Sequence, residues 1–280
     1  MAKPKSKKET SRGNTSRGSA RQGQSSSGDT SRGYGAKNHI QKKYAGNELI
    51  YGAHSVIEML KARRRRLVAI YTTKPLPKAW NRVQRYLPKR VPNIQYVPRY
   101  ILDRMCGSDE NVGIAAWVSP FSYSKKLFNP KEKPFILLLD SVQDVRNLGG
   151  ILRSAYCAGV DGVVLCKNQA APLNAAALKA SAGLAEHLDI YLAPSLKHAV
   201  IELKNAGYNL CMTVLDNGEN AMSVSYKKPL CLVIGNEATG IAKDLLPYGQ
   251  LITLPQKDPS ASYNASVAAG IFLFLLSYKD

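Results

Sequence analysis

Three polar stretches, each placed directly after an apolar run, carry side chains that could bind and orient a ligand. The first, residues 140–153, contains carboxylates, amides and arginines. The second is Gly-Asn-Glu-Ala-Thr-Gly at 235–240, where the carboxylate of Glu237 stands between glycines that allow backbone to approach a ligand closely. The third covers residues 254–264. None of them contains GxGxxG or GxxxxGKS/T, so the sequence lacks the dinucleotide-binding and P-loop patterns.

The first stretch lies between two elements that the sequence pattern predicts. The continuous apolar run 135–139 predicts a strand buried on both faces, and apolar residues at helical spacing from Ile151 onward predict a helix. Ligands of open α/β sheets bind beyond the carboxyl ends of the strands, which is where this loop lies. The alternative is an ordinary strand-to-helix turn, with Asp144 or Asn147 capping the helix and Arg153 facing solvent.

The other two polar stretches also follow predicted strands. Residues 235–240 come after the apolar run 230–234, and residues 254–264 lead into a helix of almost uninterrupted apolar residues. Ser262 or Asn264 can cap that helix, a role that is compatible with contact to a ligand. The sequence thus predicts three loops at strand ends that could share one site.

Strands and helices alternate along the chain, which is typical of an α/β fold with a mostly parallel sheet. Composition divides the chain into a basic tail at 1–45, a small α/β domain at 46–119, a linker at 120–134 and a larger α/β domain at 135–280. The small domain is expected to contain strands at 67–71, 94–97 and 114–118 and helices at 56–60, 80–87 and 100–105. The larger domain is expected to contain strands at 135–139, 162–165, 188–190, 209–215, 230–234 and 251–254 and, after the helix that includes Ile151, helices at 173–180, 195–205, 242–246 and 264–276.

The charge of the chain points to a polyanionic partner. Thirty-nine Lys and Arg against twenty Asp and Glu give a formal net charge of +19. The tail contributes eleven Lys and Arg against Glu9 and Asp29, and it has too few large apolar residues to fold alone. It could tether nucleic acid electrostatically, or it could be a solubilising or transit-like extension.

The small domain adds candidate RNA contacts to this charge. Tyr86, Tyr96 and Tyr100 could offer surfaces on which bases stack, or they could be core residues. The candidate cationic contacts are consecutive arginines, which could instead form a charged face exposed to solvent. They are Arg63, Arg64, Arg65 and Arg66.

Several protein classes are disfavoured by what the sequence lacks. No apolar run reaches the ~20 residues of a membrane-spanning helix, and the basic, polar start of the chain has no signal-peptide core. We therefore expect a cytoplasmic protein without a membrane partner. The five cysteines show no CxxC spacing and the four histidines are scattered, so we expect reduced, buried cysteines and no metal site.

The three polar loops together resemble a known family. DSVQDVRNLGGILRSAYCAGV, LVIGNEATGI and LPQKDPSASYNASVAAGI are similar, in order and separation, to the three motifs of the SpoU (TrmH-type) RNA 2′-O-methyltransferases of the SPOUT superfamily. The resemblance covers residues 135–276. The small domain, with YGAHSVIEML and NVGIAAWV, resembles the L30e-like RNA-binding domain of the subgroup that methylates a guanosine of 23S ribosomal RNA.

The resemblance implies a fold, a cofactor and partners. It implies a trefoil-knotted methyltransferase domain, S-adenosylmethionine bound in the knot, and a homodimer with its active site at the interface. The implied substrate is RNA, with 23S rRNA favoured. Transfer RNA or another rRNA nucleotide is an alternative substrate, and a non-catalytic rRNA-binding assembly factor is an alternative function.

The resemblance also assigns roles to individual residues. The catalytic positions that match the family motifs are Asn147, Arg153, Glu237, Ser262 and Asn264. The matching cofactor-binding positions are Gly235, Leu254, Tyr263 and, more loosely, Thr213. The sequence departs from the family pattern at Val145, where proline is frequent, and at Tyr263, where leucine is usual; all the polar positions are present.

The family associates Arg153 with removal of the proton from the ribose hydroxyl. Arginine has a pKa above ~12 and stays protonated in proteins. We therefore favour a cationic Arg153 that holds the nucleotide and stabilises the developing alkoxide, with the proton passing to a phosphate oxygen or to water.

Overall fold

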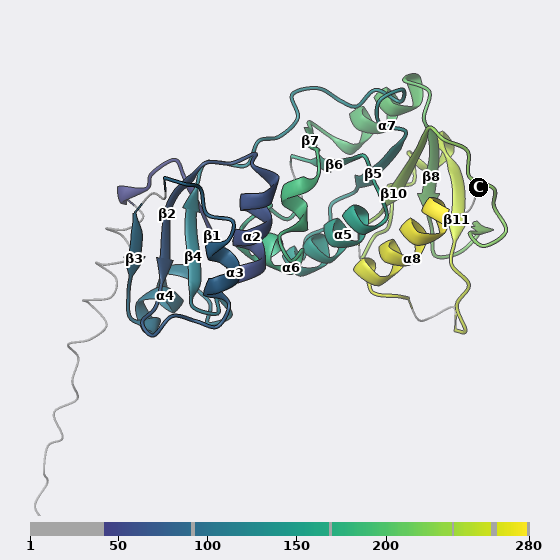
Figure 1. The fold of residues 1–280 in the computed structure, drawn as a ribbon. Helices are drawn as coiled ribbons and strands as arrows, with labels where there is room; N and C mark the ends of the chain where they lie inside the picture. The colour runs from purple at the N-terminus through teal and green to yellow at the C-terminus, as the bar shows by residue number, and fades with distance from the viewer. Residues whose placement is uncertain (1–41, 91–92, 168–169, 237, 259–261, 279–280) are drawn as a thin grey trace, which may run out of the picture.

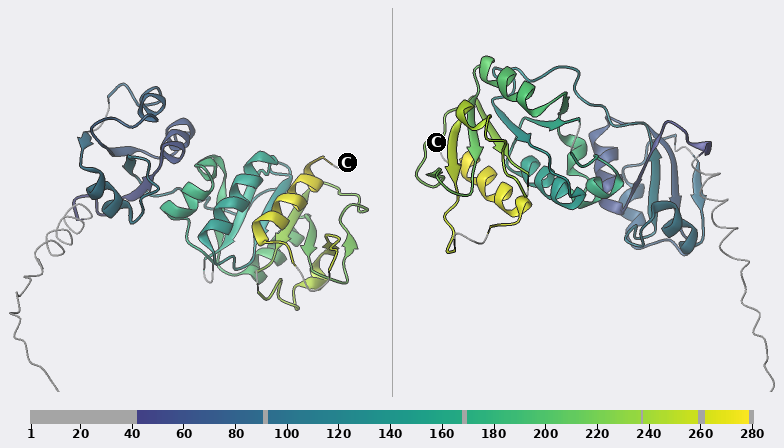
Figure 2. Two further views of the ribbon diagram at one scale, coloured as in Figure 1. Left: turned by 90° about the horizontal axis from the view of Figure 1, so that it is seen from below. Right: turned by 180° about the vertical axis from the view of Figure 1, so that it is seen from behind.

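Two β-sheets, one of four strands and one of seven, organise the chain (Figure 1). The computed structural model describes residues 42–90, 93–167, 170–236, 238–258 and 262–278. The predicted basic tail therefore lies outside the described residues, apart from its last positions. The small sheet lies at one end of the molecule and the large sheet at the other (Figure 2).

The small sheet has the strand order β1-β4-β2-β3, with β4 antiparallel to both of its neighbours. Helices cover both of its faces. Val56 and Trp80, from two of the helices, belong to one core cluster with Ile70, whereas Leu102 packs with Tyr71 on the other face. The elements are β1 (Glu48–Tyr51), α2 (Ala53–Ala62), β2 (Leu67–Thr72), α3 (Trp80–Gln84), β3 (Ile94–Tyr96), α4 (Arg99–Cys106) and β4 (Ile114–Val118).

The large sheet has the order β7-β6-β5-β10-β8-β11-β9, and every pairing in it is parallel. The expectation of an α/β fold with a mostly parallel sheet is confirmed. The strands are β5 (Phe135–Leu139), β6 (Gly162–Cys166), β7 (Ile190–Ala193), β8 (Asn209–Thr213), β9 (Glu219–Asn220), β10 (Leu230–Ile234) and β11 (Gln250–Thr253). The helices are α5 (Val145–Cys157), α6 (Ala175–Ala180), α7 (Leu196–Asn205) and α8 (Ala265–Tyr278), with 3₁₀ turns η1 (Leu184–His187) and η2 (Leu246–Tyr248).

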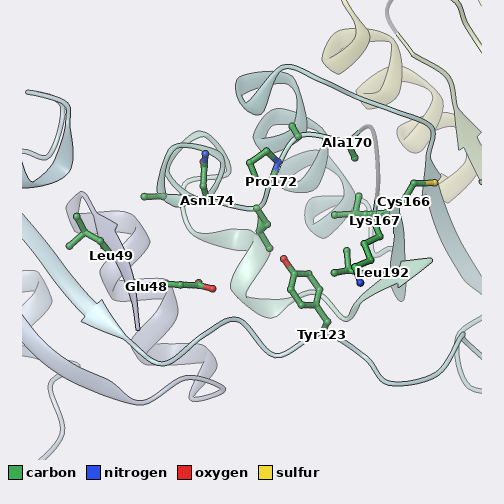
Figure 3. Close-up of a pocket in the computed structure, with 13 residues that line it drawn as sticks. Glu48, Leu49, Tyr123, Cys166, Lys167, Ala170, Pro172, Asn174 and Leu192 are labelled. Atoms are coloured by element: carbon green, nitrogen blue, oxygen red, sulfur yellow. The ribbon is translucent and has the colours of Figure 1, made fainter. Parts of the chain in front are cut away.

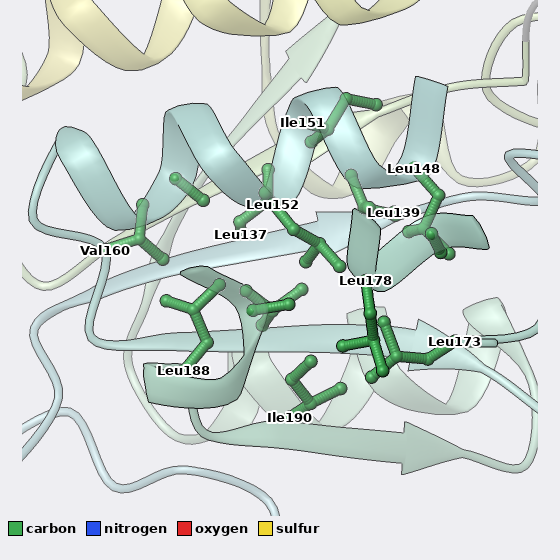
Figure 4. Close-up of a cluster of buried hydrophobic side chains, with 14 of the residues drawn as sticks. Leu137, Leu139, Leu148, Ile151, Leu152, Val160, Leu173, Leu178, Leu188 and Ile190 are labelled. Atoms are coloured by element: carbon green, nitrogen blue, oxygen red, sulfur yellow. The ribbon is translucent and has the colours of Figure 1, made fainter. Parts of the chain in front are cut away.

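Alternate residues of β5 face two different hydrophobic layers. Leu137 and Leu139 pack with Leu148, Ile151 and Leu152 of α5, as Figure 4 shows. Their neighbours Ile136 and Leu138 belong to the cluster that contains the buried residues of α7. The predicted strand at 135–139 is therefore buried on both faces, because helices cover both sides of the sheet.

Several predicted elements have other bounds than the observed ones, as four examples show. The helix expected at 80–87 ends at Gln84. The helix expected at 173–180 begins at Ala175, because Asn174 is its N-cap and accepts hydrogen bonds from the amides of Ala176 and Ala177. The strand expected at 188–190 begins at Ile190 and follows η1. The helix expected at 242–246 is a single 3₁₀ turn over Leu246–Tyr248, with a proline inside it.

Small residues let α5 approach two other helices closely. A Cβ added to Gly149 would lie 2.4 Å from Cβ of Ala180, so α6 packs directly against the α5 backbone at this point. A Cβ on Gly150 would lie 3.1 Å from Cβ of Ser266 in α8. Close packing of α8 along α5 places the start of the third motif beside the first.

Candidate functional site

The polar loops converge at the carboxyl edge of the parallel sheet. The backbone amide of Asp140 donates to the carbonyl of Ile234 at 2.8 Å, joining the end of β5 to the end of β10. Asn236 Nδ2 donates to the carbonyl oxygen of Ser141 at 2.7 Å. The loop 140–144 and the loop 235–240 are thus held together by both backbone and side-chain hydrogen bonds.

The loop 235–240 is a tight turn built around Asn236. Its backbone exchanges hydrogen bonds with Gly240 at 3.2 and 3.0 Å, and its Oδ1 accepts from the amides of Ala238 and Thr239. A Cβ on Gly235 would lie 2.5 Å from the carbonyl carbon of Gly240, so only glycine fits there. Glu237, predicted to be catalytic, lies outside the described residues. Asn236 was not predicted as a functional residue. The sequence signal that could have identified it is an asparagine directly after Gly235, because asparagine is frequent in turns.

The third polar stretch meets the first through Asn264. Asn264 Nδ2 donates to Oδ1 of Asn147 at 3.1 Å, across a sequence separation of 117 residues. Its own Oδ1 accepts from the amide of Ser266 at 2.9 Å, so Asn264 also caps α8. Asp144 caps α5 by accepting from the amide of Arg146 at 2.7 Å. Capping and contact between the motifs therefore coexist, and Ser262 lies exposed beside this junction.

Arg153 lies exposed on α5, away from this pair of amides. It follows Asn147 by six residues, which turns its side chain about 120° around the helix from Asn147. In the part of the chain that the structure describes, no acid or carbonyl pairs with the Arg153 guanidinium. The cation is therefore available to an external oxyanion, but within one chain it is not joined to Asn147 or Asn264.

The predicted cofactor positions follow three neighbouring strands. Thr213 ends β8, Gly235 follows β10 and Leu254 follows β11, and β8 lies between β10 and β11. Leu254 is buried, whereas Tyr263 is exposed. The Thr213 hydroxyl donates to the carbonyl of Val233 at 3.0 Å, so its hydrogen is used inside the sheet.

Asp140 is a buried carboxylate at the centre of the loops. Burial raises its pKa, and this effect exceeds the lowering by hydrogen bonds from the Ser141 hydroxyl, at 2.8 Å, and from the amide of Ala242. Asp140 thereby links the first loop to the segment after Gly240. These contacts indicate that Asp140 has a structural role, which is to hold the loops together.

The run of four arginines divides into two kinds of environment. The Arg65 side chain is fully buried, with ion pairs to Glu48 at 2.5 Å and to Glu186 at 3.0 Å. Arg64 contacts Asp189 at 2.7 Å and the carbonyl of Leu188 at 2.9 Å. These two arginines join the small domain to the large one, and Arg65 is closed to RNA in this arrangement. Arg63 and Arg66 are exposed and stay predicted RNA contacts.

A cavity of about 580 Å³ lies at the domain junction (Figure 3). Glu48 and Leu49 of β1 line one side, and Lys167, Leu192 and Tyr123 line the other. None of the described residues predicted for catalysis or cofactor binding lines this cavity. It is therefore separate from the three loops.

The described residues show neither a membrane-spanning helix nor a metal-binding cluster. None of the helices there is long and apolar enough to cross a membrane. The same residues hold no cluster of three or more His, Cys, Asp or Glu suited to a metal ion. Cys106, Cys157, Cys166, Cys211 and Cys231 are all free, and Cys157 is exposed at the end of α5, contrary to the expected burial.

Two family models match the chain. The model of the SpoU rRNA Methylase family matches residues 134–274. The model described as RNA 2′-O ribose methyltransferase substrate binding matches residues 49–124. The two matches cover the large and the small sheet respectively.

Similar proteins and structures agree with these matches. The chain is 32% identical over 237 residues to the putative TrmH family tRNA/rRNA methyltransferase YacO of Bacillus subtilis (strain 168), covering 81% of this chain and 94% of that protein. A structure titled as an RNA 2′-O ribose methyltransferase has a TM-score of 0.75 and 19% identity, covering 89% of this chain and 96% of that one. The AdoMet-bound rRNA methyltransferase from Sinorhizobium meliloti has a TM-score of 0.70 and 21% identity, covering 90% and 95%. At these identities the structural likeness shows a shared fold.

Proposed function

The chain belongs to the SpoU rRNA Methylase family, and we propose that it transfers a methyl group from S-adenosylmethionine to a ribose 2′-hydroxyl of RNA. A guanosine of 23S ribosomal RNA is the favoured substrate, by resemblance of the small domain to L30e-like RNA-binding domains. The resemblance to the SpoU family inferred from the three motifs is confirmed. The observation that carries the proposal is the convergence of those motifs, tied by Asn236 to Ser141 and by Asn264 to Asn147.

The strand-end loops suit an adenosine-containing cofactor. Ile234 and Leu254 offer buried apolar walls, and the turn at 235–240 brings backbone polar groups to the same edge. Gly235, Leu254, Tyr263 and Thr213 would hold S-adenosylmethionine there. When bound, it supplies an electrophilic methyl group. The protein's tasks are to place a ribose hydroxyl within about 3–3.5 Å of that methyl and to help it lose a proton.

Arg153 performs the second task as a cation. Its guanidinium stays protonated, offers a planar fork of donors, and has no partner among the described acids to compete with the nucleotide. It holds the ribose or its phosphate and stabilises the developing alkoxide, while the proton passes to a phosphate oxygen or to water. Asn147 and Asn264 fix the relative position of the first and third motifs, and Glu237 and Ser262 complete the predicted set.

A second copy of this chain is proposed to complete the site. The outer face of α8 carries an exposed apolar stripe opposite its buried face, formed by Val267, Ile271, Phe274 and Tyr278. The spacing of these residues places them on one side of the helix. An exposed apolar stripe beside a site that one chain leaves divided favours a dimer interface there. Phe274→Glu should give monomers in sedimentation and lose methyl transfer; a dimeric, active variant would contradict this assignment.

The proposal also includes a trefoil knot in the C-terminal domain. What supports it is the path of the chain: β10 lies between β5 and β8, and α8, which follows β11, returns to pack along α5. When a knotted chain is pulled from both ends, its maximum extension should be shorter than the contour length of its residues. Extension to the full length would contradict the knot.

Mapping of ribose methylation in RNA from cells with and without this protein identifies the substrate. The proposal predicts that one guanosine of 23S rRNA loses its methyl group when the protein is removed. Loss of a ribose methyl group in transfer RNA or at another rRNA nucleotide would change the assigned substrate but leave the assigned reaction unchanged. An unchanged methylation map, with changed ribosome assembly, would favour the non-catalytic assembly factor.

A further inference from the structure

A line of side-chain contacts crosses the junction between the two domains, starting beside Arg153. Tyr156 follows Arg153 by three residues on α5, so the two side chains are neighbours on the helix surface. Tyr156 is 42% exposed, and the centroid of its ring lies 5.2 Å from that of the His187 ring in η1. His187 Nε2 in turn lies 2.9 Å from Glu58 Oε2 on α2 of the small domain. The surface around Arg153 is thus continuous with the small domain.

The line continues along the small domain through a cation and a second exposed ring. Lys61 donates to Glu58 at 2.8 Å, and its ammonium group lies 5.2 Å from the centroid of Tyr86. Tyr86 is 44% exposed and follows Arg85, the C-cap of α3. Arg82 and Arg85 are exposed beside it and have no acidic partner among the described residues. Two half-exposed rings and several cations therefore lie along one path.

The acid on this path is Glu58, and its paired negative charge does not prevent binding of a polyanion. Burial acts to raise the pKa of Glu58, but hydrogen bonds from Lys61 and His187 outweigh it and hold that pKa below its usual range. The carboxylate is therefore ionised at neutral pH and already paired with Lys61. Tyr156 and Tyr86 both stay nearly half exposed, which a purely structural contact between domains would not require.

We propose that this path binds the RNA strand next to the methylated nucleotide, with unpaired bases stacking on Tyr156 and Tyr86. We name it the junction track: Arg153, Tyr156, His187, Lys61, Tyr86, Arg82 and Arg85. Single-stranded RNA fits because aromatic faces stack on unpaired bases and cations neutralise the backbone. The inference rests on the proposed function, in that Arg153 sets the end of the track where the ribose lies.

Paired variants of the full-length protein test the track. Tyr156→Leu and Tyr86→Leu remove a ring and keep apolar bulk, whereas Tyr156→Phe and Tyr86→Phe keep the ring. Tyr100→Leu is the matched comparison. Tyr100 was the third candidate for stacking in the small domain, but it is 63% exposed on α4, which packs on the opposite face of the small sheet, so the track excludes it. The readouts are the Kd for a short fluorescent single-stranded RNA of mixed sequence, the KM and kcat for unmodified rRNA, and the Kd for S-adenosylmethionine.

Each leucine variant should raise the Kd for RNA and the KM about tenfold, because loss of a stacked base costs that much or more. The phenylalanine variants and Tyr100→Leu should bind RNA as the parent does, and the Kd for S-adenosylmethionine should not change. RNA binding by the leucine variants equal to that of the parent, or an equal loss in Tyr100→Leu, would overturn the track. A parent protein that binds RNA through both rings but transfers no methyl group would overturn the proposed function and leave the track standing.

Discussion

The side-chain amide of Asn264 donates a 3.1 Å hydrogen bond to Oδ1 of Asn147, and its own oxygen caps α8 by accepting from the Ser266 amide. One residue therefore fixes the start of α8 and ties it to the start of α5. The first and third motifs meet at this bond, so the geometry of the proposed site depends on it.

The two roles of Asn264 can be separated by substitution. Asn264→Ser keeps a good N-cap but is too short to reach Asn147, whereas Asn264→Ala removes both contacts. We expect Asn264→Ala to lower the free energy of unfolding by about 1 kcal/mol and Asn264→Ser to change it little. Both should lower kcat for methyl transfer. If Asn264→Ser transferred methyl groups to RNA at the full rate, measured as label retained with RNA on filters, the bond to Asn147 would be dispensable.

Arg153 is expected to act on the nucleotide through its planar fork. Arg153→Lys should lose most of kcat, since a point charge does not reproduce bidentate contacts, while the Kd for S-adenosylmethionine measured by calorimetry changes little. Arg146→Lys is the control, because Arg146 lies seven residues earlier on the same exposed side of α5 and has no assigned role. Equal loss of cofactor affinity in Arg153→Lys would remove Arg153 from the role given to it here.

In the second motif, Gly235 is the position that least tolerates a side chain. In Gly235→Ala the new Cβ would meet the Gly240 backbone at 2.5 Å, so the turn must move. We expect a loss of about 1–3 kcal/mol in unfolding free energy and weaker binding of S-adenosylmethionine. Gly270→Ala serves as the comparison, because its nearest neighbour would be Ser154 Oγ at an ordinary 3.4 Å, and it should be neutral or stabilising. Normal cofactor affinity in Gly235→Ala would mean that the turn does not shape the pocket.

The sequence was sufficient for most strands and for the loops that follow them, because buried parallel strands are continuous apolar runs. It did not predict β1 or β9, which are short. It did not predict the bond between Asn147 and Asn264, since 117 residues separate them and either could have been only a cap. Nor did it separate Arg65 from its neighbours in the arginine run. That distinction depends on Glu186, which tertiary packing brings to Arg65 from the other domain. Asn236 was missed because most of its contacts are with backbone groups.

The buried Arg65 is expected to control stability and the junction between domains. Arg65→Ala would leave the buried carboxylate of Glu186 without its cation, at a cost of about 3–5 kcal/mol. Arg66→Ala, at an exposed position, should cost within about 0.5 kcal/mol. Thermal and urea unfolding of the two variants measures the difference. Similar midpoints for both would show that the buried ion pair does not hold the domains together.

Transfer of radiolabelled methyl groups from S-adenosylmethionine to unmodified total RNA, followed by digestion to nucleosides, tests the central claim most directly. The account predicts label in 2′-O-methylguanosine, recovered from 23S rRNA and absent when the protein carries Arg153→Lys. No labelled RNA, or label on a base instead of a ribose, would contradict it.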